Sequence, residues 1–455
     1  MNSKDRYWLH SGVMSIFQSV WGLVFGFGGF YILVRQLNKD DFGTWALFST
    51  TVMILEFIRN GLVQNALIKF LATDKDSYNE ILSASFTISG ILSLFCIIIN
   101  LTFAKYLAEL WHSPALEAMF YLYNVVYIFT GILSQFQFIG QANLDFKGSV
   151  VSAFSRQGVF FIYILTCFIL KAPVSLLSLV YMQGAGIFVA TLVAWLYARK
   201  YLGFKYALAM QWVWKLFNYG KYAFGTTISA MLSNSLDQMM LGSMLTTAAA
   251  GSYSIAIRIT NIIEIPTSSV ASIVFPQSAI RMQEEGEQGV KRLYEKSVGT
   301  ILAILIPGLV LLLLFAENVV DFITSSKYPE TIPILQITVL YCILIPYGRQ
   351  FGIIFDSIGK TRITFIIVVI TAAINAGLNY LFIRRYGAIG AAIATLLANI
   401  VGFIIAQIML YRTLGINSLN PWIYAFKFYP EFYKKYLVLY VFKAKKLTNT
   451  FLKSS

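Results

Sequence analysis

Residues 237–282 read DQMMLGSMLTTAAAGSYSIAIRITNIIEIPTSSVASIVFPQSAIRM. The stretch contains two apolar segments joined by a short turn of small residues, and the second segment carries Arg258 and Glu264. Ionisable residues inside an apolar segment of membrane length are energetically expensive, and they usually face a protein interior or a wet cavity. The stretch therefore predicts a membrane protein that holds charged groups within the bilayer.

A fainter copy of this pattern lies near the N-terminus. The segments LNKDDFG at 37–43 and LTTAAAG at 245–251 both place a leucine six positions before a glycine. A glutamate follows each glycine after thirteen positions, at Glu56 and at Glu264. This correspondence predicts a chain that is built from two similar halves.

The composition is that of an integral membrane protein. The 455 residues are 58% hydrophobic and only 12% charged, whereas soluble domains average about 25% charged residues. We interpret the net charge of +14 as basic loops between membrane spans, so no nucleic-acid partner is expected. The first apolar run, 11–34, is long enough to span a bilayer, and no cleavable signal peptide is visible.

Apolar runs of about 20 residues predict an all-α protein with twelve transmembrane helices. The predicted spans are 11–34, 43–66, 81–104, 116–140, 149–170, 174–198, 218–242, 250–280, 297–316, 331–357, 361–383 and 386–411. They divide the chain into a six-helix bundle at 1–198, a basic cytoplasmic connection at 199–217 and a second six-helix bundle at 218–412. A basic amphipathic tail, 413–455, is expected to lie on the anionic inner leaflet.

The positions of lysine and arginine orient the chain. With the N-terminus in the cytoplasm, 24 of the 35 basic residues fall in inner segments and 7 in outer segments. Both termini are therefore predicted to be cytoplasmic. The four remaining basic residues lie within spans, and all are arginines: Arg59, Arg156, Arg258 and Arg349. Four acidic residues also fall within spans: Glu56, Asp237, Glu264 and Asp356.

These charges lead to a hypothesis for the site. A guanidinium group stays charged and forms paired hydrogen bonds to phosphate or carboxylate. The four arginines therefore predict a hydrated, positive cavity that binds an anionic or diphosphate-bearing substrate. In the alternative, each arginine pairs with an acid, as Glu56 and Arg59 can on one helix and Asp237 and Arg258 can across neighbouring helices. Both interpretations stay open, because a paired arginine can exchange its partner for a substrate.

Prolines and polar residues mark further positions. Proline kinks a helix and frees backbone carbonyls, and broken helices in transporters bend during gating or line the site. The gating candidates are Pro266 and Pro276 in the eighth span, Pro307 in the ninth and Pro346 in the tenth. A static kink is the alternative for each. In the seventh span, Asn234 and Asp237 are three residues apart and are expected to face one interior, either lining the cavity or bonding to other helices.

Three stretches carry a family resemblance. They are VRQLNKDDFGTWAL at 34–47, the opening stretch with its Asp237, Gly251, Tyr253, Arg258 and Phe275–Pro276, and GKTRITFIIVVITAAINAGLNYLFIRRYGAIGAAIATLLANIVG at 359–402. Through them the chain resembles the polysaccharide-export branch of the MATE/oligosaccharidyl-lipid flippase (MOP) superfamily, typified by the Wzx-like O-antigen flippases.

The resemblance implies two six-helix bundles around a central cavity that opens alternately to each side. The implied cargo is an undecaprenyl-diphosphate-linked oligosaccharide, such as the repeat unit of an O-antigen or another surface polysaccharide. It would be moved from the inner to the outer leaflet of a bacterial inner membrane. Implied partners are the lipid bilayer, a polysaccharide polymerase and chain-length machinery. Cavity arginines are expected in such flippases, and Arg258 alone lies within a matched motif.

The same residues also bear on four alternative functions. A multidrug antiporter of this fold would use buried carboxylates for sodium or proton coupling, but four arginines would repel a cationic drug. A lipid II flippase is a nearer alternative, although such proteins usually carry extra spans. A polymerase is disfavoured because no large outer loop is present, and an acyltransferase because His10 and His112 lie near span ends or loops.

The chain is accordingly expected to be a transporter rather than an enzyme, without a cofactor. It has no GxxxxGK[ST] motif for nucleotide binding, so an ion gradient, the membrane potential or the substrate gradient must supply the energy. Its three cysteines lie in apolar segments too far apart for a metal motif, and no metal site is expected.

Overall fold

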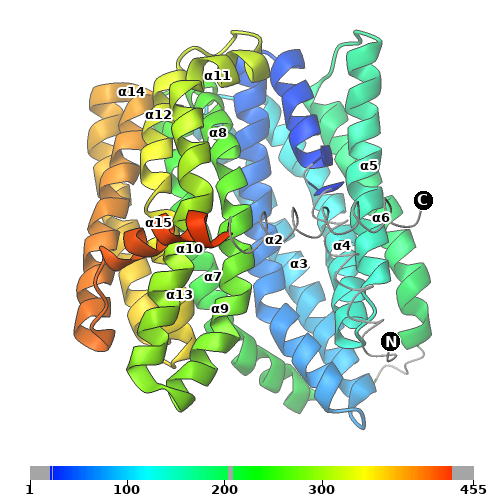
Figure 1. Cartoon of the computed structure of the whole chain (residues 1–455). Helices are drawn as coiled ribbons and strands as arrows, with labels where there is room; N and C mark the ends of the chain where they lie inside the picture. The colour runs from blue at the N-terminus through cyan, green and yellow to red at the C-terminus, as the bar shows by residue number, and fades with distance from the viewer. Residues whose placement is uncertain (1–20, 23, 203–206, 208, 433–455) are drawn as a thin grey trace, which may run out of the picture. The chain divides into compact units, whose positions relative to one another are not determined.

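The computed structural model describes residues 21, 22, 24–202, 207 and 209–432, except the side chains of 222, 223, 225–230, 232–234, 272, 276, 431 and 432. Every regular element within these residues is a helix, which confirms the predicted all-α class (Figure 1). The side chain of Asn234, most of the predicted first span and the tail beyond residue 432 lie outside the described residues.

The described residues form two compact units. Unit 1 comprises the chain up to Ser254 together with Val320–Tyr328, and unit 2 comprises Ile255–Val319 together with the chain from Pro329. This division differs from the predicted boundaries at 198 and 218. The reason is that α7 (Met210–Met244) packs along α2 (Lys39–Thr73) and so belongs to unit 1.

Unit 1 contains the counterparts of the predicted spans one to seven. Residues 24–36 are helical and precede α2. The next helices are α3 (Tyr78–Leu110), α4 (Ala115–Ala142), α5 (Lys147–Ile169), α6 (Leu176–Ala198) and the short η1 (Arg199–Tyr201). The first residues of α8 (Thr247–Thr260) and the end of α11 (Ala316–Thr324) complete the unit. Because α7 begins at Met210, the basic connection is shorter than the predicted 199–217.

Unit 2 contains two broken helices where the sequence predicted single spans. The predicted span 250–280 consists of α8, η2 (Asn261–Ile263) and α9 (Glu264–Glu284). The predicted span 331–357 consists of α12 (Thr331–Cys342) and α13 (Ile345–Ser357), which are bent by 41°. A proline ring clashes with the carbonyl four residues earlier. For Pro266 that residue is Ile262 in η2, and for Pro346 it is Cys342, where α12 ends.

The remaining helices of unit 2 are α10 (Gly286–Leu314), α14 (Thr361–Leu414) and α15 (Asn420–Phe432). The two spans predicted at 361–383 and 386–411 both lie in α14, which consists of two helices joined at a kink. Gly387 has φ 63° and ψ −142° at this kink. Glycine suits the position because it has no Cβ to oppose a positive φ.

α10 shows what a mid-helix proline does to its neighbours. Pro307 lies inside α10 without ending it, and it cannot donate to the carbonyl of Ala303. The hydroxyl of Tyr429 on α15 donates to this carbonyl at 2.7 Å. The amide of Asn420 also donates to Glu295 on α10 at 2.7 Å. The described part of the predicted tail is therefore a helix that is bonded to α10.

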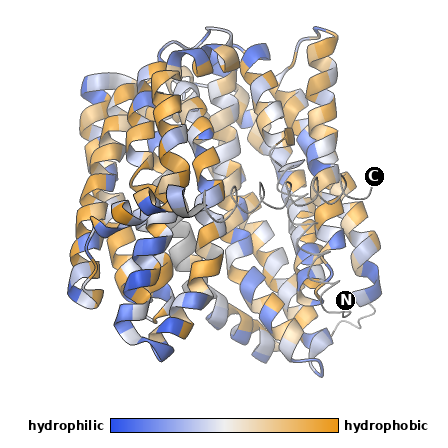
Figure 2. Ribbon diagram, viewed as in Figure 1, coloured by the Kyte–Doolittle hydropathy of each residue, from blue (hydrophilic) through white to orange (hydrophobic). Residues whose placement is uncertain are grey.

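The helices are suited to a membrane. Seven described helices are long and apolar enough to cross one, or eight if the bent pair α12–α13 forms one span. α14 counts once in this number although it contains two helices. Hydrophobic residues dominate the helices, and hydrophilic residues gather toward helix ends and loops (Figure 2). The chain is a multi-pass membrane protein, while the total of twelve spans stays a prediction.

Gly43 lies where α2 meets the start of α8. A Cβ atom on Gly43 would lie 1.8 Å from the carbonyl oxygen of Thr247, and a Cβ atom on Gly251 would lie 3.1 Å from the Cα of Gly43. Gly43 and Gly251 are the corresponding glycines of the two predicted halves. The two glycines that correspond in the predicted repeat therefore lie in backbone contact.

Two further contacts near the helix ends follow the same reciprocal pattern. At the end of α3, the Trp111 indole donates to the carbonyl of Met239 on α7 at 3.2 Å. At the end of α11, the Arg35 guanidinium donates to the carbonyl of Ile323 at 3.3 Å and stacks on the Tyr31 ring at 4.1 Å. The ends of α3 and α11 thus each pack against the first helix of the other predicted half. This contact explains why the end of α11 belongs to unit 1.

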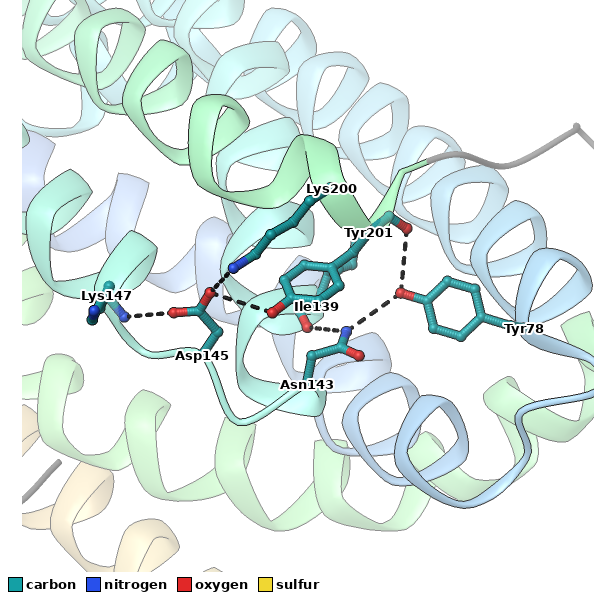
Figure 3. A network of polar contacts seen from close by, with 7 residues as sticks. All are labelled: Tyr78, Ile139, Asn143, Asp145, Lys147, Lys200 and Tyr201. Atoms are coloured by element: carbon teal, nitrogen blue, oxygen red, sulfur yellow. Dashed lines mark hydrogen bonds and ion pairs between the residues drawn. The ribbon is translucent and has the colours of Figure 1, made fainter. Parts of the chain in front are cut away.

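A polar network joins three connections of unit 1 (Figure 3). In the α4–α5 connection, Asp145 accepts from the Lys200 ammonium at 2.6 Å and from the Tyr201 hydroxyl at 3.3 Å. Asn143 of the same connection donates to the Tyr78 hydroxyl at 3.3 Å, and Tyr78 donates to the Tyr201 carbonyl at 3.4 Å. The segments that the charge pattern predicts to be cytoplasmic therefore lie together at one end of the unit.

The pKa of Asp145 reflects these contacts. Burial by itself would raise the pKa of the carboxyl group. The hydrogen bond and the charge of Lys200, the backbone N–H of Lys147 and the hydroxyl of Tyr201 act in the opposite direction and hold the pKa below its ordinary value. A depressed carboxyl pKa means that the folded state favours the ionised form.

We expect Gly43→Ala to destabilise the protein by about 1–3 kcal/mol, because the methyl group would meet a backbone carbonyl that cannot turn aside. Thermal unfolding in detergent measures the change. Gly90→Ala on α3 is the control, since nothing lies within 4 Å of its Cβ position. That substitution should be neutral or stabilising, and equal behaviour of the two variants would contradict the contact.

We expect Asp145→Asn to lower stability at pH 7 by about 0.5–1 kcal/mol, the range for a partly exposed ion pair. Because the folded pKa is depressed, the stabilisation is complete above the unfolded pKa of about 3.9 and is lost as the pH falls through the folded value. The thermal midpoints of the wild-type protein and of Asp145→Asn should therefore converge as the pH falls from about 5 to about 3. Asp76→Asn, at an exposed carboxyl, should show no such convergence.

Candidate functional site

The charged residues predicted within spans occupy three kinds of surroundings. Some are enclosed among the helices of unit 1, two form an ion pair beside a cavity in unit 2, and the others are exposed. The enclosed residues are Glu56, Arg59 and Asp237, the paired residues are Glu264 and Arg349, and the exposed residues are Arg156, Arg258 and Asp356.

Arg59 is one of the most deeply buried side chains of the protein, with 1% of its surface exposed. Its guanidinium donates from α2 to three groups on α4: the Tyr127 carbonyl at 3.0 Å, the Thr130 hydroxyl at 2.7 Å and the Ser134 hydroxyl at 3.5 Å. It also donates to the Asn60 amide oxygen at 3.2 Å. All four acceptors are neutral, so Arg59 is a buried cation in a neutral polar shell.

The local ion pair between Glu56 and Arg59 is not formed. Among the described residues, no carboxylate lies within 4.0 Å of the Arg59 guanidinium. Glu56 instead accepts a hydrogen bond from the Tyr123 hydroxyl at 2.9 Å. The pairing alternative fails because α4 offers Arg59 carbonyl and hydroxyl acceptors at the level where its side chain enters the bundle.

Asp237 is likewise satisfied within unit 1. Its side chain is 4% exposed and accepts from the Tyr253 hydroxyl at 2.6 Å. Tyr253 is the aromatic residue two positions beyond Gly251, so the glycine contact also places the donor. Arg258 belongs to unit 2, and its pairing with Asp237 stays a hypothesis.

Arg349 and Glu264 form an ion pair in unit 2, with Nη2 and Oε2 2.5 Å apart. The side chains keep 45% and 38% of their surfaces exposed. A cavity of about 430 Å³ lies beside them and is lined by Ser268, Ala271, Phe275, Arg349 and Ile353. Arg349 thus lines a cavity, and its role in binding a substrate stays a prediction.

The broken helices position this pair. Glu264 is the first residue of α9, directly after η2. Arg349 lies in the second turn of α13, shortly after the bend that follows α12. Ser268 and Ala271 then continue the face of α9 that Glu264 begins, at helical spacings of four and three. Both partners thus lie next to a break, and the cavity runs between the helices that restart there.

The other predicted residues have separate places. Arg156 on α5 and Arg258 on α8 are exposed, and Asp356 is exposed at the end of α13. These residues do not line the cavity of about 430 Å³. A common site for the four arginines stays a prediction.

Sequence reasoning missed the α4 partners of the charges, which are the hydroxyls of Tyr123, Thr130 and Ser134 and the carbonyl of Tyr127. These four residues follow one another at spacings of four, three and four along α4, which is one face of a helix. This polar stripe in an apolar span was visible in the sequence. The cavity-lining Phe275 carried no such signal, because an aromatic residue in a span is ordinary.

The family comparison covers most of the chain. The sequence model of the family described as "Polysaccharide biosynthesis protein" matches residues 32–333. A relative from Haloferax volcanii, "Probable low-salt glycan biosynthesis flippase Agl15", is 26% identical over 187 residues. That match covers 40% of this chain and 39% of the relative, so the chain spans well under half of the relative's length.

A second relative aligns over most of its length. "Lipopolysaccharide biosynthesis protein WzxC" of Escherichia coli K12 is 20% identical over 408 residues, which cover 86% of this chain and 78% of the relative. Among solved structures, an inward-facing multidrug resistance MATE family transporter of the MOP superfamily has a TM-score of 0.75 at 16% identity. That match covers 88% of this chain and 94% of the transporter. The predicted superfamily resemblance is thus confirmed for the fold.

We expect Arg59→Met to leave thermal stability unchanged or to raise it by about 1–4 kcal/mol, since a buried charge is replaced by an apolar side chain of similar length. No hydroxyl would be left unsatisfied, because Thr130 and Ser134 already donate to carbonyls of their own helix at 3.0 and 2.8 Å. Thermal unfolding in detergent checks this. Arg156→Met, at an exposed arginine, is the control, and a large loss of stability in Arg59→Met alone would contradict the expectation.

Proposed function

The chain belongs to the polysaccharide biosynthesis protein family, and on that premise we propose that it is a flippase for a lipid-diphosphate-linked oligosaccharide. The proposed cargo is the undecaprenyl-diphosphate-linked repeat unit of an O-antigen or another surface polysaccharide. It moves from the inner to the outer leaflet of a bacterial inner membrane. The names of Agl15, a probable flippase of glycan biosynthesis, and of WzxC, a lipopolysaccharide biosynthesis protein, support this proposal.

The observation that carries the proposal is the exposed ion pair of Arg349 and Glu264 beside the cavity of about 430 Å³. Exposed ion pairs contribute only about 0–1 kcal/mol, so little free energy is lost when Arg349 releases Glu264. A phosphate carries more negative charge and more acceptor oxygens than a carboxylate, and it can take the paired donors of Arg349. In the proposed cycle, Glu264 holds Arg349 when no cargo is bound.

The breaks beside the pair supply the proposed movement. Glu264 begins α9 after η2, and Arg349 follows the 41° bend between α12 and α13. When phosphate replaces the carboxylate, the ion pair between α9 and α13 is lost, while the hydrogen bond between Ser278 and Ser357 still joins the two helices. The helices then rotate at η2 and at the α12–α13 bend. We propose this exchange as the link between cargo binding and alternating access.

A multidrug antiporter is the second candidate, because the chain shares the fold of a MATE transporter. The fold is common to both functions, so the cavity must separate them. Arg349 at the cavity favours an anion and repels an organic cation. A lipid II flippase remains a neighbouring alternative, since its cargo is also a lipid diphosphate and would use the same arginine.

The energy source and the partners are part of the proposal. Coupling to a proton or sodium gradient would require a carboxylate that gains or loses its cation during the cycle. The candidates are Glu56, Asp237, Glu264 and Asp356, and Glu264 is favoured because its ion pair is exposed. A polymerase and chain-length machinery would use the flipped repeat unit. No catalytic step is assigned to the chain.

We expect Arg349→Ala to reduce translocation of a lipid-linked oligosaccharide by about tenfold, which corresponds to the loss of about 1.4 kcal/mol of cargo binding. Translocation into reconstituted vesicles and export of surface polysaccharide in complemented cells measure the effect. Lysine at this position should restore part of the activity, because it keeps the charge without the paired donors. The amount of protein in the membrane should not change.

Arg384→Ala is the matched control, because Arg384 is exposed and stacks on Tyr380 at 4.0 Å rather than lining the cavity. It should translocate at the wild-type rate. Full activity of Arg349→Ala would reject the arginine assignment. Export of organic cations, without movement of lipid-linked sugar, would instead establish the antiporter.

A further inference from the structure

Two lysines meet over one aromatic ring where α2 ends and α7 begins. The Lys69 ammonium lies 5.5 Å from the centroid of the Phe70 ring, and the Lys215 ammonium lies 5.5 Å from the same centroid. Each lysine also has a second ring: Lys69 lies 4.3 Å from the Tyr219 centroid and Lys215 lies 4.0 Å from the Trp212 centroid. We call these five residues the lysine–aromatic cluster.

The cluster has a rigid base. Phe70 packs edge-on against Trp212 and Tyr219, with centroid distances of 5.6 Å to each. Trp212 is 4% exposed and belongs to an apolar core of unit 1 in which α2, α3, α4 and α7 meet. The rings therefore hold both lysine side chains in place, and a ligand would spend less free energy on ordering them.

The two ammonium groups have no acidic partner among the described residues. No carboxylate lies within 4.0 Å of Lys69 or Lys215. Both ammonium groups lie 5.5 Å from the centroid of Phe70, and like charges near one ring repel each other. An anion that bound both would offset this repulsion.

The neighbouring side chains place the cluster at the membrane surface. Trp214, Phe217 and Tyr219 of α7 are 60%, 41% and 41% exposed. Exposed tryptophan and tyrosine at helix ends are typical of the membrane–water interface, where lipid phosphates lie. By the predicted topology, this end of α2 and α7 faces the cytoplasm. Lipid-borne phosphate is therefore the anion that reaches the cluster most readily.

We propose that the lysine–aromatic cluster is a cytoplasmic docking site for the diphosphate of the lipid-linked cargo. Lysine binds phosphate as a compact point charge, and two of them match the two phosphates of a diphosphate. The proposal rests on the proposed flippase function and adds a first binding step on unit 1. The contacts with Tyr219 and Trp212 hold the two lysines at separate rings and leave their ammonium groups accessible to the ligand.

The test measures binding of a polyprenyl diphosphate to the full chain in detergent, with the corresponding polyprenyl alcohol as the ligand without phosphate. We expect Lys69→Gln, Lys215→Gln to weaken diphosphate binding about tenfold or more and to leave alcohol binding unchanged. Lys69→Arg, Lys215→Arg should retain binding, which excludes a folding defect as the cause. Binding should also weaken with rising salt, because the site is exposed.

Lys105→Gln, Lys171→Gln is the matched control, since both lysines are exposed in unit 1 away from the cluster. Binding equal to wild type in Lys69→Gln, Lys215→Gln would overturn the inference and leave the flippase proposal standing. Absence of diphosphate binding to the wild-type chain would overturn both. Equal competition by phosphatidylglycerol would show a general phospholipid contact and overturn the assignment to cargo.

Discussion

The close backbone contact at Gly43 constrains the whole of unit 1. Because a Cβ at this position would lie 1.8 Å from a carbonyl oxygen, α2 and the start of α8 can approach only through glycine. This approach aligns α2 with α7, and α2 carries Glu56 and Arg59 into the bundle and Lys69 to its end. A second close approach lies further along α2, where a Cβ on Gly220 of α7 would lie 1.9 Å from the Leu62 carbonyl oxygen. The chemistry that unit 1 offers is thus arranged along a helix whose position depends on glycines at these contacts.

The two halves of the repeat use corresponding glutamates differently. Glu56 lies within α2, an unbroken helix of 35 residues, and is bonded to Tyr123. Glu264 begins α9 after a break and pairs with Arg349 at a cavity. Pro266 accounts for the difference, since α2 has no proline at the corresponding place. Both glutamates are part-exposed, but only Glu264 holds an arginine beside a cavity, so its half is the one suited to exchange partners with a cargo.

Much of the fold followed from apolar length and from charge. The helices of unit 1 and the two helices of α14 match predicted spans because burial in lipid demands about 20 apolar residues in each. The breaks at η2 and after Cys342 were only partly foreseen: prolines marked them, but sequence did not show that Pro307 would remain inside α10 with Tyr429 bonded to the freed carbonyl. Arg349 was found as an arginine left over from the loops. Its pairing with Glu264 rather than with a local acid depends on how α9 and α13 pack, which residue spacing does not encode.

The position of Arg59 has an electrical consequence. Its guanidinium is enclosed among neutral acceptors on α4, and Glu56 lies three residues earlier on the same helix. A fixed charge inside a membrane experiences the transmembrane field, and carrying one charge fully across is worth about 2.3 kcal/mol per 100 mV. Because Glu56 and Arg59 have opposite charges, a displacement of α2 along the membrane normal would carry little net charge. The membrane potential would therefore do little work on this helix.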